Sequence, residues 1–384
     1  MPSLLTHVYV LIIYTSWVTL LAMTTNTVSE PAGVAITTIL SILVIVNVTG
    51  NSLVCAAIIK HHDMRTPTNY LLVNLALADI IVALFIAPQF ILIHTFKHPG
   101  GMIGTVLCKL LTGGTFMWLG ATASAFTLVV IAFERYYAVL QPHSIKGKMT
   151  NSKLKVSAAV IRKRQNHHLI YKDEGMDYVL CLLFIVPTIW MSSALLNAPS
   201  FFTKYFSEQD YFCTQHWPEQ WMAKAQGLTW LLLAAGAPMI AMGVLYSRVV
   251  YSLWIKRDGR TNGSQRGVIR VRKRVTKMVV TISIIYGLCW TPDIVIFALI
   301  LFSSKFAYGD AADITSIVLV ACNSTVNPIV YTYLNDQFRS KIKALLCGTG
   351  VVKNRVHIAA RPREEICSQP QKFSGNVQAI SCSV

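Results

Sequence analysis

Charged side chains are scarce in this 384-residue chain, because Asp, Glu, Lys and Arg make up only 13% of it, about half the fraction in an ordinary soluble domain. Acidic residues are the rarer kind, with 17 Asp and Glu against 34 Lys and Arg. Disordered chains combine low hydrophobicity with dense charge, whereas 54% of these residues are hydrophobic. The composition therefore excludes a disordered chain, argues against a soluble domain and indicates a protein solvated largely by lipid.

The sequence also lacks the short motifs of several site chemistries. None of its nine cysteines forms a CxxC pair or a Cys/His cluster at the spacing of zinc ligands. It contains no GxxxxGK[ST], GxSxG or HExxH motif, so phosphate-binding loops, nucleophile elbows and zinc-protease helices find no support. We therefore expect neither a zinc site nor an enzyme of these classes.

Long apolar stretches dominate the chain. A bilayer core about 30 Å thick requires about 20 mostly apolar helical residues, because a helix satisfies its own backbone hydrogen bonds in hydrocarbon. Seven stretches meet this requirement: 34–59, 70–94, 107–133, 179–196, 227–251, 275–302 and 314–334. They predict an all-α membrane protein built as a seven-transmembrane helix bundle.

Residues 8–23 form an eighth and shorter apolar stretch that contains several hydroxyl side chains. We interpret it as a signal peptide or leader within an N-terminal region 1–33, although only His7 stands before it and the cleavage site near Ala22 is poor. An extra span and a wrongly assigned start are the alternatives.

The basic excess follows the expected topology. Lys and Arg gather in the loops after spans 1, 3 and 5 and in the segment after span 7. Under the positive-inside rule these segments are cytoplasmic and the N-terminus is extracellular. We therefore expect a multi-pass plasma-membrane protein surrounded by membrane lipids. No basic stretch interleaves aromatic residues as in single-strand binders, so no nucleic-acid partner is expected.

Asp79, in the sequence NLALADI, lies deep in span 2, and a carboxylate inside a span is costly and usually functional. Oxygen-bearing side chains that we expect to converge on it are Asn51, Ser124, Asn323, Ser324 and Asn327. Such a pocket suits a small hard cation or a proton. The alternative is a polar contact that only holds helices together.

The sequence Glu134-Arg135-Tyr136 closes span 3 at its predicted cytoplasmic end. The adjacent opposite charges suggest an arginine that is held in one geometry at rest and released in another. A snorkelling arginine at a helix end is the simpler alternative.

Prolines interrupt spans 4 to 7 at Pro187, Pro238, Pro292 and Pro328. Each removes a backbone hydrogen bond and creates a kink that can serve as a hinge. Trp290 stands two residues before Pro292. Its ring therefore lies where a hinge could move it, although most aromatic residues in spans serve packing.

These residues in this order resemble the rhodopsin-like (class A) G-protein-coupled receptors, and most of all their neuropeptide receptors. The matching motifs are GNSLV at 50–54, NLALAD at 74–79, Cys108, ERY at 134–136, Pro238 with Tyr246, CWTP at 289–292, NSTVNPIVY at 323–331, and Phe338. The resemblance covers residues 34–347. It implies a seven-helix receptor domain, followed by a cytoplasmic tail 348–384 that we expect to be disordered.

The resemblance implies roles for the matching positions. Cys108 would form a disulfide with Cys213, and both lie on the predicted oxidising side of the membrane. Asp79, Ser124, Asn323 and Asn327 would hold an allosteric sodium ion, and no other cofactor or metal is expected. Residues 335–347 would form an interfacial helix, with Cys347 as a palmitoylation candidate.

The resemblance also implies that a heterotrimeric G protein is the partner. Span 6 would swing outward to admit it. The residues implied in coupling and activation are Glu134, Arg135, Tyr136, Tyr246, Trp290, Pro292, Asn327, Pro328 and Tyr331.

Several positions depart from the family pattern. The family often has an acidic residue near the start of span 6 that holds the span 3 arginine, but Arg270, Arg272, Lys273 and Arg274 stand here. Glu134 is therefore expected to be the only acid that restrains Arg135, with help from Thr276. Because this restraint is weaker than the usual one, basal signalling should be measurable. The interval from Cys108 to Arg135 is about two residues longer than usual, and the first outer loop, HPGGMIG, lacks the family's usual Trp.

Residues 162–178, RKRQNHHLIYKDEGMDY, interrupt an otherwise apolar region. Span 4 of the family usually has a Trp nine or ten residues before a proline such as Pro187, where this chain has Tyr178 and Asp177. We interpret the segment as a retained intron or wrong exon boundary, with a genuine long cytoplasmic loop as the alternative. Sequencing the transcript across this junction distinguishes the two.

The ligand class follows from what the upper spans contain. Span 3 has no acid near Met117 for an amine ligand, and span 7 has no Lys for retinal. Asp293 directly follows Pro292 and is costly to bury unless a cation arrives, so we expect it to bind an Arg or Lys of a peptide ligand. Gln89, Met117 and Trp290 are further candidates for that site.

Other ligands and functions stay open. A non-peptide small molecule is the alternative ligand. Asp293 could instead contact a neighbouring helix and have no role in ligand binding. A transporter or channel is a further alternative, but the spans show no internal repeat. An intramembrane enzyme would need paired catalytic groups at one depth, and the family layout separates Asp79 from Asp293.

Overall fold

The computed structural model describes residues 30–91, 98–140, 173–208, 212–255, 263–303, 305–306 and 308–346. Within them, seven helical segments are long and apolar enough to cross a membrane, as predicted. They are Gly33–Lys60, Pro67–Ile91, Gly101–Leu140, Leu183–Thr203, Gln220–Ile255, Ile269–Phe302 and Ala311–Leu334. The predicted leader 8–23, residues 162–172, Cys347 and the tail 348–384 lie outside the described residues.

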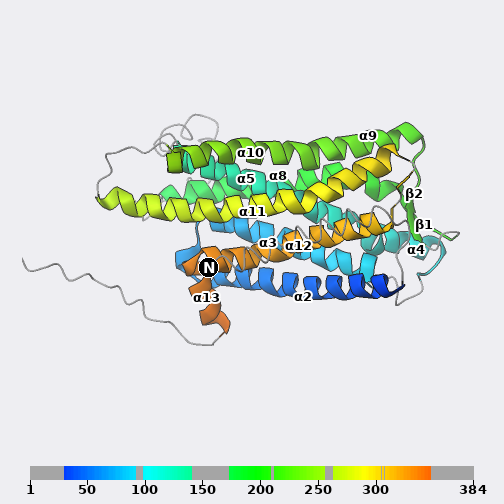
Figure 1. Ribbon diagram of the computed structural model, residues 1–384, viewed down its shortest axis with the longest axis horizontal. Coiled ribbons are helices and arrows are strands. Elements are labelled where there is room, and N and C mark those ends of the chain that lie inside the picture. Colours follow the sequence, from blue (N-terminus) through cyan, green and yellow to red (C-terminus); the bar gives the residue numbers. More distant parts are fainter. Residues whose placement is uncertain are drawn as a thin grey trace, which may run out of the picture.

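The segments run side by side as an elongated bundle (Figure 1). Their α-helices are α2 (Glu30–Lys60), α3 (Pro67–Ile86), α4 (Gly101–Leu107), α5 (Thr115–Leu140), α8 (Asp173–Thr203), α9 (Gln220–Trp230), α10 (Ala237–Val250), α11 (Gly263–Phe302), α12 (Ala311–Leu334) and α13 (Asp336–Leu346). A short 3-10 turn η1 (His62–Met64) joins α2 to α3, and π-helical turns occupy η2 (Ala87–Ile91), η4 (Cys108–Thr112), η5 (Leu231–Gly236) and η6 (Tyr251–Ile255).

The two ends of the bundle are distinct. At one end lies the antiparallel hairpin of β1 (Lys204–Ser207) and β2 (Phe212–Gln215), which pairs Lys204 with Gln215. At the other end α13 turns away from the bundle axis (Figure 1). We refer to these as the hairpin end and the α13 end.

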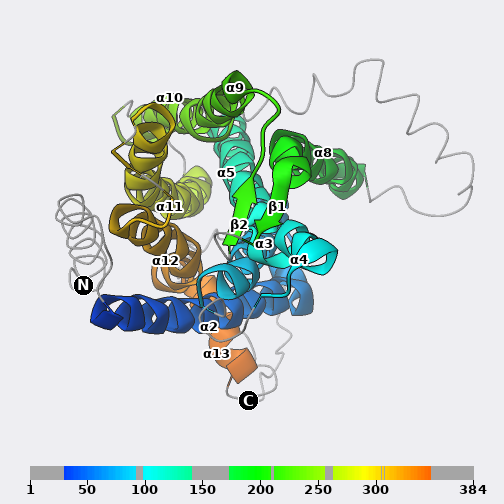
Figure 2. The ribbon, with the colours of Figure 1, turned by 90° about the vertical axis from the view of Figure 1, so that its right-hand side faces the viewer.

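Burial varies strongly among the helices. In the most apolar part of α12, 83% of the residues are buried, against 17% in that of the span Leu183–Thr203 of α8. Viewed along the bundle, α8 lies at the periphery and α12 packs between α2 and α11 (Figure 2). Outward side chains such as Leu195 and Ile240 are apolar and 76% and 69% exposed, which suits contact with lipid tails.

Local sequence explains where several helices begin. Thr66 caps α3 by accepting the backbone N–H of Asn69 at 3.3 Å, and Pro67 occupies the first turn, where its missing N–H is not needed. In α13, Phe338 and Ile342 are buried on one face while charged residues fill the other. This confirms the predicted amphipathic helix after span 7.

Span 3 is not one continuous helix. The π-turn η4 follows α4, and Gly113 and Gly114 separate it from α5. Gly114 has φ +70°, a conformation that L side chains rarely adopt. The break absorbs the surplus residues noted between Cys108 and Arg135, so α5 keeps an ordinary register towards its end.

Candidate functional site

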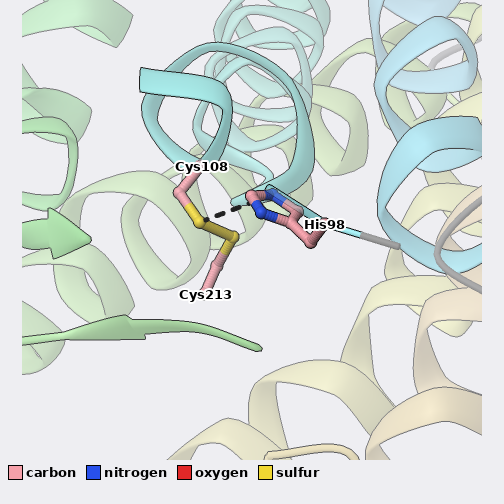
Figure 3. Close-up of side chains that lie close together, drawn as sticks. All are labelled: His98, Cys108 and Cys213. Atoms are coloured by element: carbon pink, nitrogen blue, oxygen red, sulfur yellow. Dashed lines mark hydrogen bonds between the residues drawn. A yellow bond between two sulfur atoms is a disulfide. The ribbon is translucent and has the colours of Figure 1, made fainter. Parts of the chain in front are cut away.

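The disulfide between Cys108 and Cys213 pins the hairpin to η4 at the top of span 3, with Cα atoms 5.6 Å apart, as the resemblance implied. His98 lies against it, with its Nε2 3.9 Å from Cys108 Sγ (Figure 3). The same nitrogen is 2.9 Å from Thr112 Oγ1. The His98 ring also stacks on Phe206 with centroids 4.4 Å apart. This pair covers the disulfide in a loop that lacks the family's usual Trp, and the two sulfur atoms are not free to bind a metal.

A buried polar pocket surrounds Asp79. Its Oδ1 accepts a hydrogen bond from Ser124 Oγ at 3.2 Å, and its Oδ2 accepts one from Asn327 Nδ2 at 2.7 Å. Asn323, one turn before Asn327, is also buried, but no contact joins it to Asp79 among the hydrogen bonds of the described residues. The amide oxygens of Asn51, Asn323 and Asn327 are buried without a donor in the described part of the chain. Oxygens of this kind suit a small cation.

Arg135 is held at the α13 end by two neighbours. It forms a bidentate ion pair with Glu134, and its Nη2 donates to Thr68 Oγ1 at 2.6 Å. Thr68 donates in turn to Glu134 Oε2 at 3.2 Å, so the three side chains form a closed network. The expected help from Thr276 is wrong, because its hydroxyl is buried without a partner among the described residues. Thr68 takes that place.

The basic residues near the start of α11 include Arg274, which pairs with an acidic residue of α13. Arg274 lies 3.3 Å from Asp336 of α13, and Asp336 also pairs with Arg339. Lys341 of α13 lies 2.9 Å from Asp63, and this hydrogen bond lowers the pKa of Asp63. Contacts between exposed charges contribute little to stability, so α13 tethers span 6 only loosely.

The remaining activation candidates are buried in the interior. Tyr246 and Tyr331 are 6% and 0% exposed, and their hydroxyls have no partner among the described residues. Tyr136 instead packs edge-to-face on Tyr137. Pro292 and Pro328 lie inside α11 and α12, which both continue past them as helix. Buried phenols without partners are costly.

An aromatic cluster occupies the hairpin half of the bundle. Trp290 lies 6.1 Å from Trp118, 6.4 Å from Trp230 and 5.6 Å from Tyr286 between ring centroids, and Phe297 packs on Trp230 at 5.4 Å. These rings come from α5, α9 and α11. Only Trp290 of this cluster was identified in the sequence analysis. The other rings were not predicted, because spacing along the sequence does not show which residues of separate spans are in contact.

Asp293 lies one turn beyond Trp290 and is 3% exposed. Its Oδ1 is 3.1 Å from Ser316 Oγ, but that hydroxyl is closer, at 2.7 Å, to the backbone oxygen of Asp313. A hydroxyl has one proton to donate, and Asp293 Oδ2 has no donor among the described residues. The carboxylate is therefore poorly compensated by the protein.

The other two ligand candidates are also placed at this end. Met117 is fully buried in the first turns of α5. Gln89 lies in η2 at the top of span 2, and its Oε1 is buried without a partner among the described residues.

Span 4 contains Trp190, a residue not considered in the sequence analysis. Trp190 Nε1 donates to Asn74 Oδ1 at 2.9 Å, which fastens α8 to α3. Pro199 follows nine residues later in the same helix. The expectation that span 4 lacks its usual Trp is therefore wrong, because it was measured from Pro187 instead of Pro199.

This arrangement is that of a seven-helix membrane receptor. The chain belongs to the family described as 7 transmembrane receptor (rhodopsin family), which matches residues 50–161 and 174–331, well over half of the chain. The match leaves out residues 162–173, most of the segment that stood out in the sequence.

Curated relatives of this chain include receptors for neuropeptides. It is 26% identical over 326 residues to the Tachykinin-like peptides receptor 86C of Drosophila melanogaster, covering 80% of this chain and 58% of that protein. It is 26% identical to Neuropeptide FF receptor 2 of Rattus norvegicus, covering 76% of this chain and 67% of the receptor. The Allatostatin-A receptor of Bombyx mori is also 26% identical, with coverages of 79% and 76%.

Proposed function

We propose that this chain is a plasma-membrane receptor that binds an extracellular peptide at the hairpin end and activates a heterotrimeric G protein at the α13 end. Asp293 carries the ligand half of this proposal. It is a buried carboxylate with an unpartnered oxygen, next to an aromatic cluster whose ring faces attract cations. A guanidinium or ammonium group of a peptide would supply the missing counter-charge, and the names of the relatives support a peptide.

The experiment is a peptide screen on cells that express the full chain. G-protein activation is read as guanine-nucleotide exchange in their membranes, against cells expressing the Arg135→Ala variant at equal surface level. We expect Arg- or Lys-containing peptides to raise exchange in the first cells and not in the second. A screen that yields only uncharged small molecules would overturn the peptide assignment and favour the alternative ligand class.

The network that holds Arg135 at the α13 end leads to a second prediction. Glu134 and Thr68 hold Arg135, and no acid of α11 supports them. We expect outward movement of span 6 to free Arg135 for the G protein and to bring Tyr246 and Tyr331 into new contacts. Glu134→Gln should therefore raise basal nucleotide exchange about fivefold or more, since such couplings are worth about 1–3 kcal/mol.

The matched control is Glu219→Gln, which removes an exposed carboxylate at the hairpin end. It should leave basal exchange unchanged. Equal basal exchange in Glu134→Gln and in the unmodified chain would show that Glu134 does not restrain Arg135.

We also propose that Asp79, Ser124, Asn323 and Asn327 hold a sodium ion in the resting receptor. The Asp79 carboxylate and the three buried amide oxygens without a donor, from Asn51, Asn323 and Asn327, are ligand types that suit such an ion. The ion would supply positive charge that compensates Asp79, while Ser124 and Asn327 orient the carboxylate. Replacing choline by sodium at equal ionic strength should lower agonist affinity about fivefold or more. The Asp79→Asn variant should lose this response, and a variant that keeps it would remove Asp79 from the site.

A further inference from the structure

The break in span 3 places a helix N-terminus inside the hairpin end. α5 begins at Thr115, directly after Gly113 and Gly114. The first N–H groups of a helix have no intrahelical acceptors and carry a partial positive charge, which favours an anion there. Thr115 is 6% exposed, and its hydroxyl has no partner among the described residues.

A lysine lies at the same break. Lys204, the first residue of β1, donates from Nζ to the backbone oxygen of Gly113. An ammonium has three protons to donate, and no carboxylate pairs with Lys204 among the ion pairs of the described residues. Burial lowers the pKa of Lys204 to about 8, as expected for a cation without a nearby anion.

Gln89 completes this group from span 2. An ideal Cβ on Gly114 would lie 2.1 Å from Gln89 Oε1, so the Gln89 amide lies directly against the break. The ammonium of Lys204 and the hydroxyl of Thr115 can each donate a hydrogen bond, and so can the amide nitrogen of Gln89, whose Nε2 lies 2.9 Å from the same ideal Cβ. A carboxylate accepts through two oxygens and can use all three.

A negative charge, that of Asp293, lies on the other side of the hairpin end from Lys204. Asp293 belongs to α11 and contacts α12, and these helices lie across the bundle from α4 and β1 (Figure 2). A charge that is shielded from water and lacks a counter-charge is destabilising, and among the described ion pairs neither Asp293 nor the half-buried Lys204 has one.

We propose that the ligand is zwitterionic, with its cationic group at Asp293 and a carboxylate at Lys204, Thr115 and Gln89. This inference rests on the proposed peptide receptor and names a second group that the peptide must carry. Both a C-terminal carboxylate and an Asp or Glu side chain have this chemistry.

The test uses randomised tetrapeptide pools with one fixed Arg, made in three matched series. One series ends in a free carboxylate, one in a carboxamide, and one in a carboxamide with a Glu at a fixed position. Each series is assayed for nucleotide exchange on the unmodified chain, on Lys204→Gln, and on Lys224→Gln, which removes an exposed lysine from the same end. Surface expression is matched for all three.

We expect the unmodified chain and Lys224→Gln to respond to an acid-containing series at concentrations about 10- to 100-fold lower than to the plain carboxamides, because hydrogen bonds to charged groups have this strength. In Lys204→Gln the difference should fall below about threefold. A preference for the free-acid series identifies a C-terminal carboxylate, and a preference for the Glu series identifies a side chain.

Two results would overturn the inference. The three series could be equally potent on the unmodified chain, or Lys204→Gln could weaken all of them equally, which is the signature of a purely structural lysine. If no series activates the chain while Arg135-dependent exchange is intact, the proposed peptide receptor itself fails.

Discussion

Gly114→Ala should lower the amount of receptor at the cell surface several-fold. Gly114 has φ +70°, and a Cβ at this position would lie 2.1 Å from Gln89 Oε1 and 2.8 Å from Gln89 Cδ. A non-glycine residue in this backbone region costs about 1–3 kcal/mol, and the end of the flexible Gln89 side chain would also have to move away from the new methyl group. Because a domain of this kind has only about 5–15 kcal/mol of stability, we expect a large loss of folded protein, measured by surface labelling and by the thermal unfolding temperature of purified receptor.

Gly243→Ala is the control for this prediction. Gly243 lies in α10 with an ordinary helical conformation, and nothing lies within 4 Å of its ideal Cβ. Alanine favours helix over glycine by about 1 kcal/mol, so this variant should be as abundant as the unmodified chain or more so. Equal surface levels of both alanine variants would show that span 3 does not need the break.

Asp293→Asn should raise the agonist concentration for half-maximal response by one to two decades. The substitution keeps the shape of the side chain and removes the charge that would pair with a basic group of the peptide. A charge-assisted hydrogen bond of this type is worth about 1.5–3 kcal/mol. The measurement is a dose–response curve of nucleotide exchange with the best Arg-containing peptide of the screen.

The Ser316→Ala variant tests whether the effect comes from the charge of Asp293 or from its hydrogen bond to Ser316. It removes the only described donor to Asp293 and leaves the carboxylate in place, so potency should stay the same or improve. Asp293→Glu should retain part of the response. An unchanged dose response in Asp293→Asn would remove this residue from the ligand site.

The sequence was sufficient for the large elements of this fold. Membrane spans are long and apolar, so hydropathy located all seven, and the short motifs placed Asp79, Arg135 and Trp290 on the right helices. The Cys108–Cys213 pairing also followed from the resemblance. These features depend on local composition or on fixed spacing, which a single chain displays directly.

Features that depend on contacts between spans were less accessible. Thr68 holds Arg135 from a position 67 residues earlier, and no spacing rule links two such sites. Trp190 was overlooked because the register of span 4 was taken from Pro187 alone, whereas α8 extends further and contains Pro199 as well. No motif distinguishes Lys204 in the sequence, and only the fold of the hairpin onto the Gly113–Gly114 break half-buries it there.

The π-helical turn η5 determines which way Trp230 faces. A π-turn contains one more residue than the α-helical turn it replaces, so it offsets α9 from α10 by one position. One residue of an α-helix corresponds to a rotation of about 100°. Without the surplus residue in Leu231–Gly236, α10 would keep its packing on α5, but Trp230 would turn away from Trp118, Trp290 and Phe297. The helical phase of span 5, and with it the shape of the aromatic cluster, thus depends on a single inserted residue.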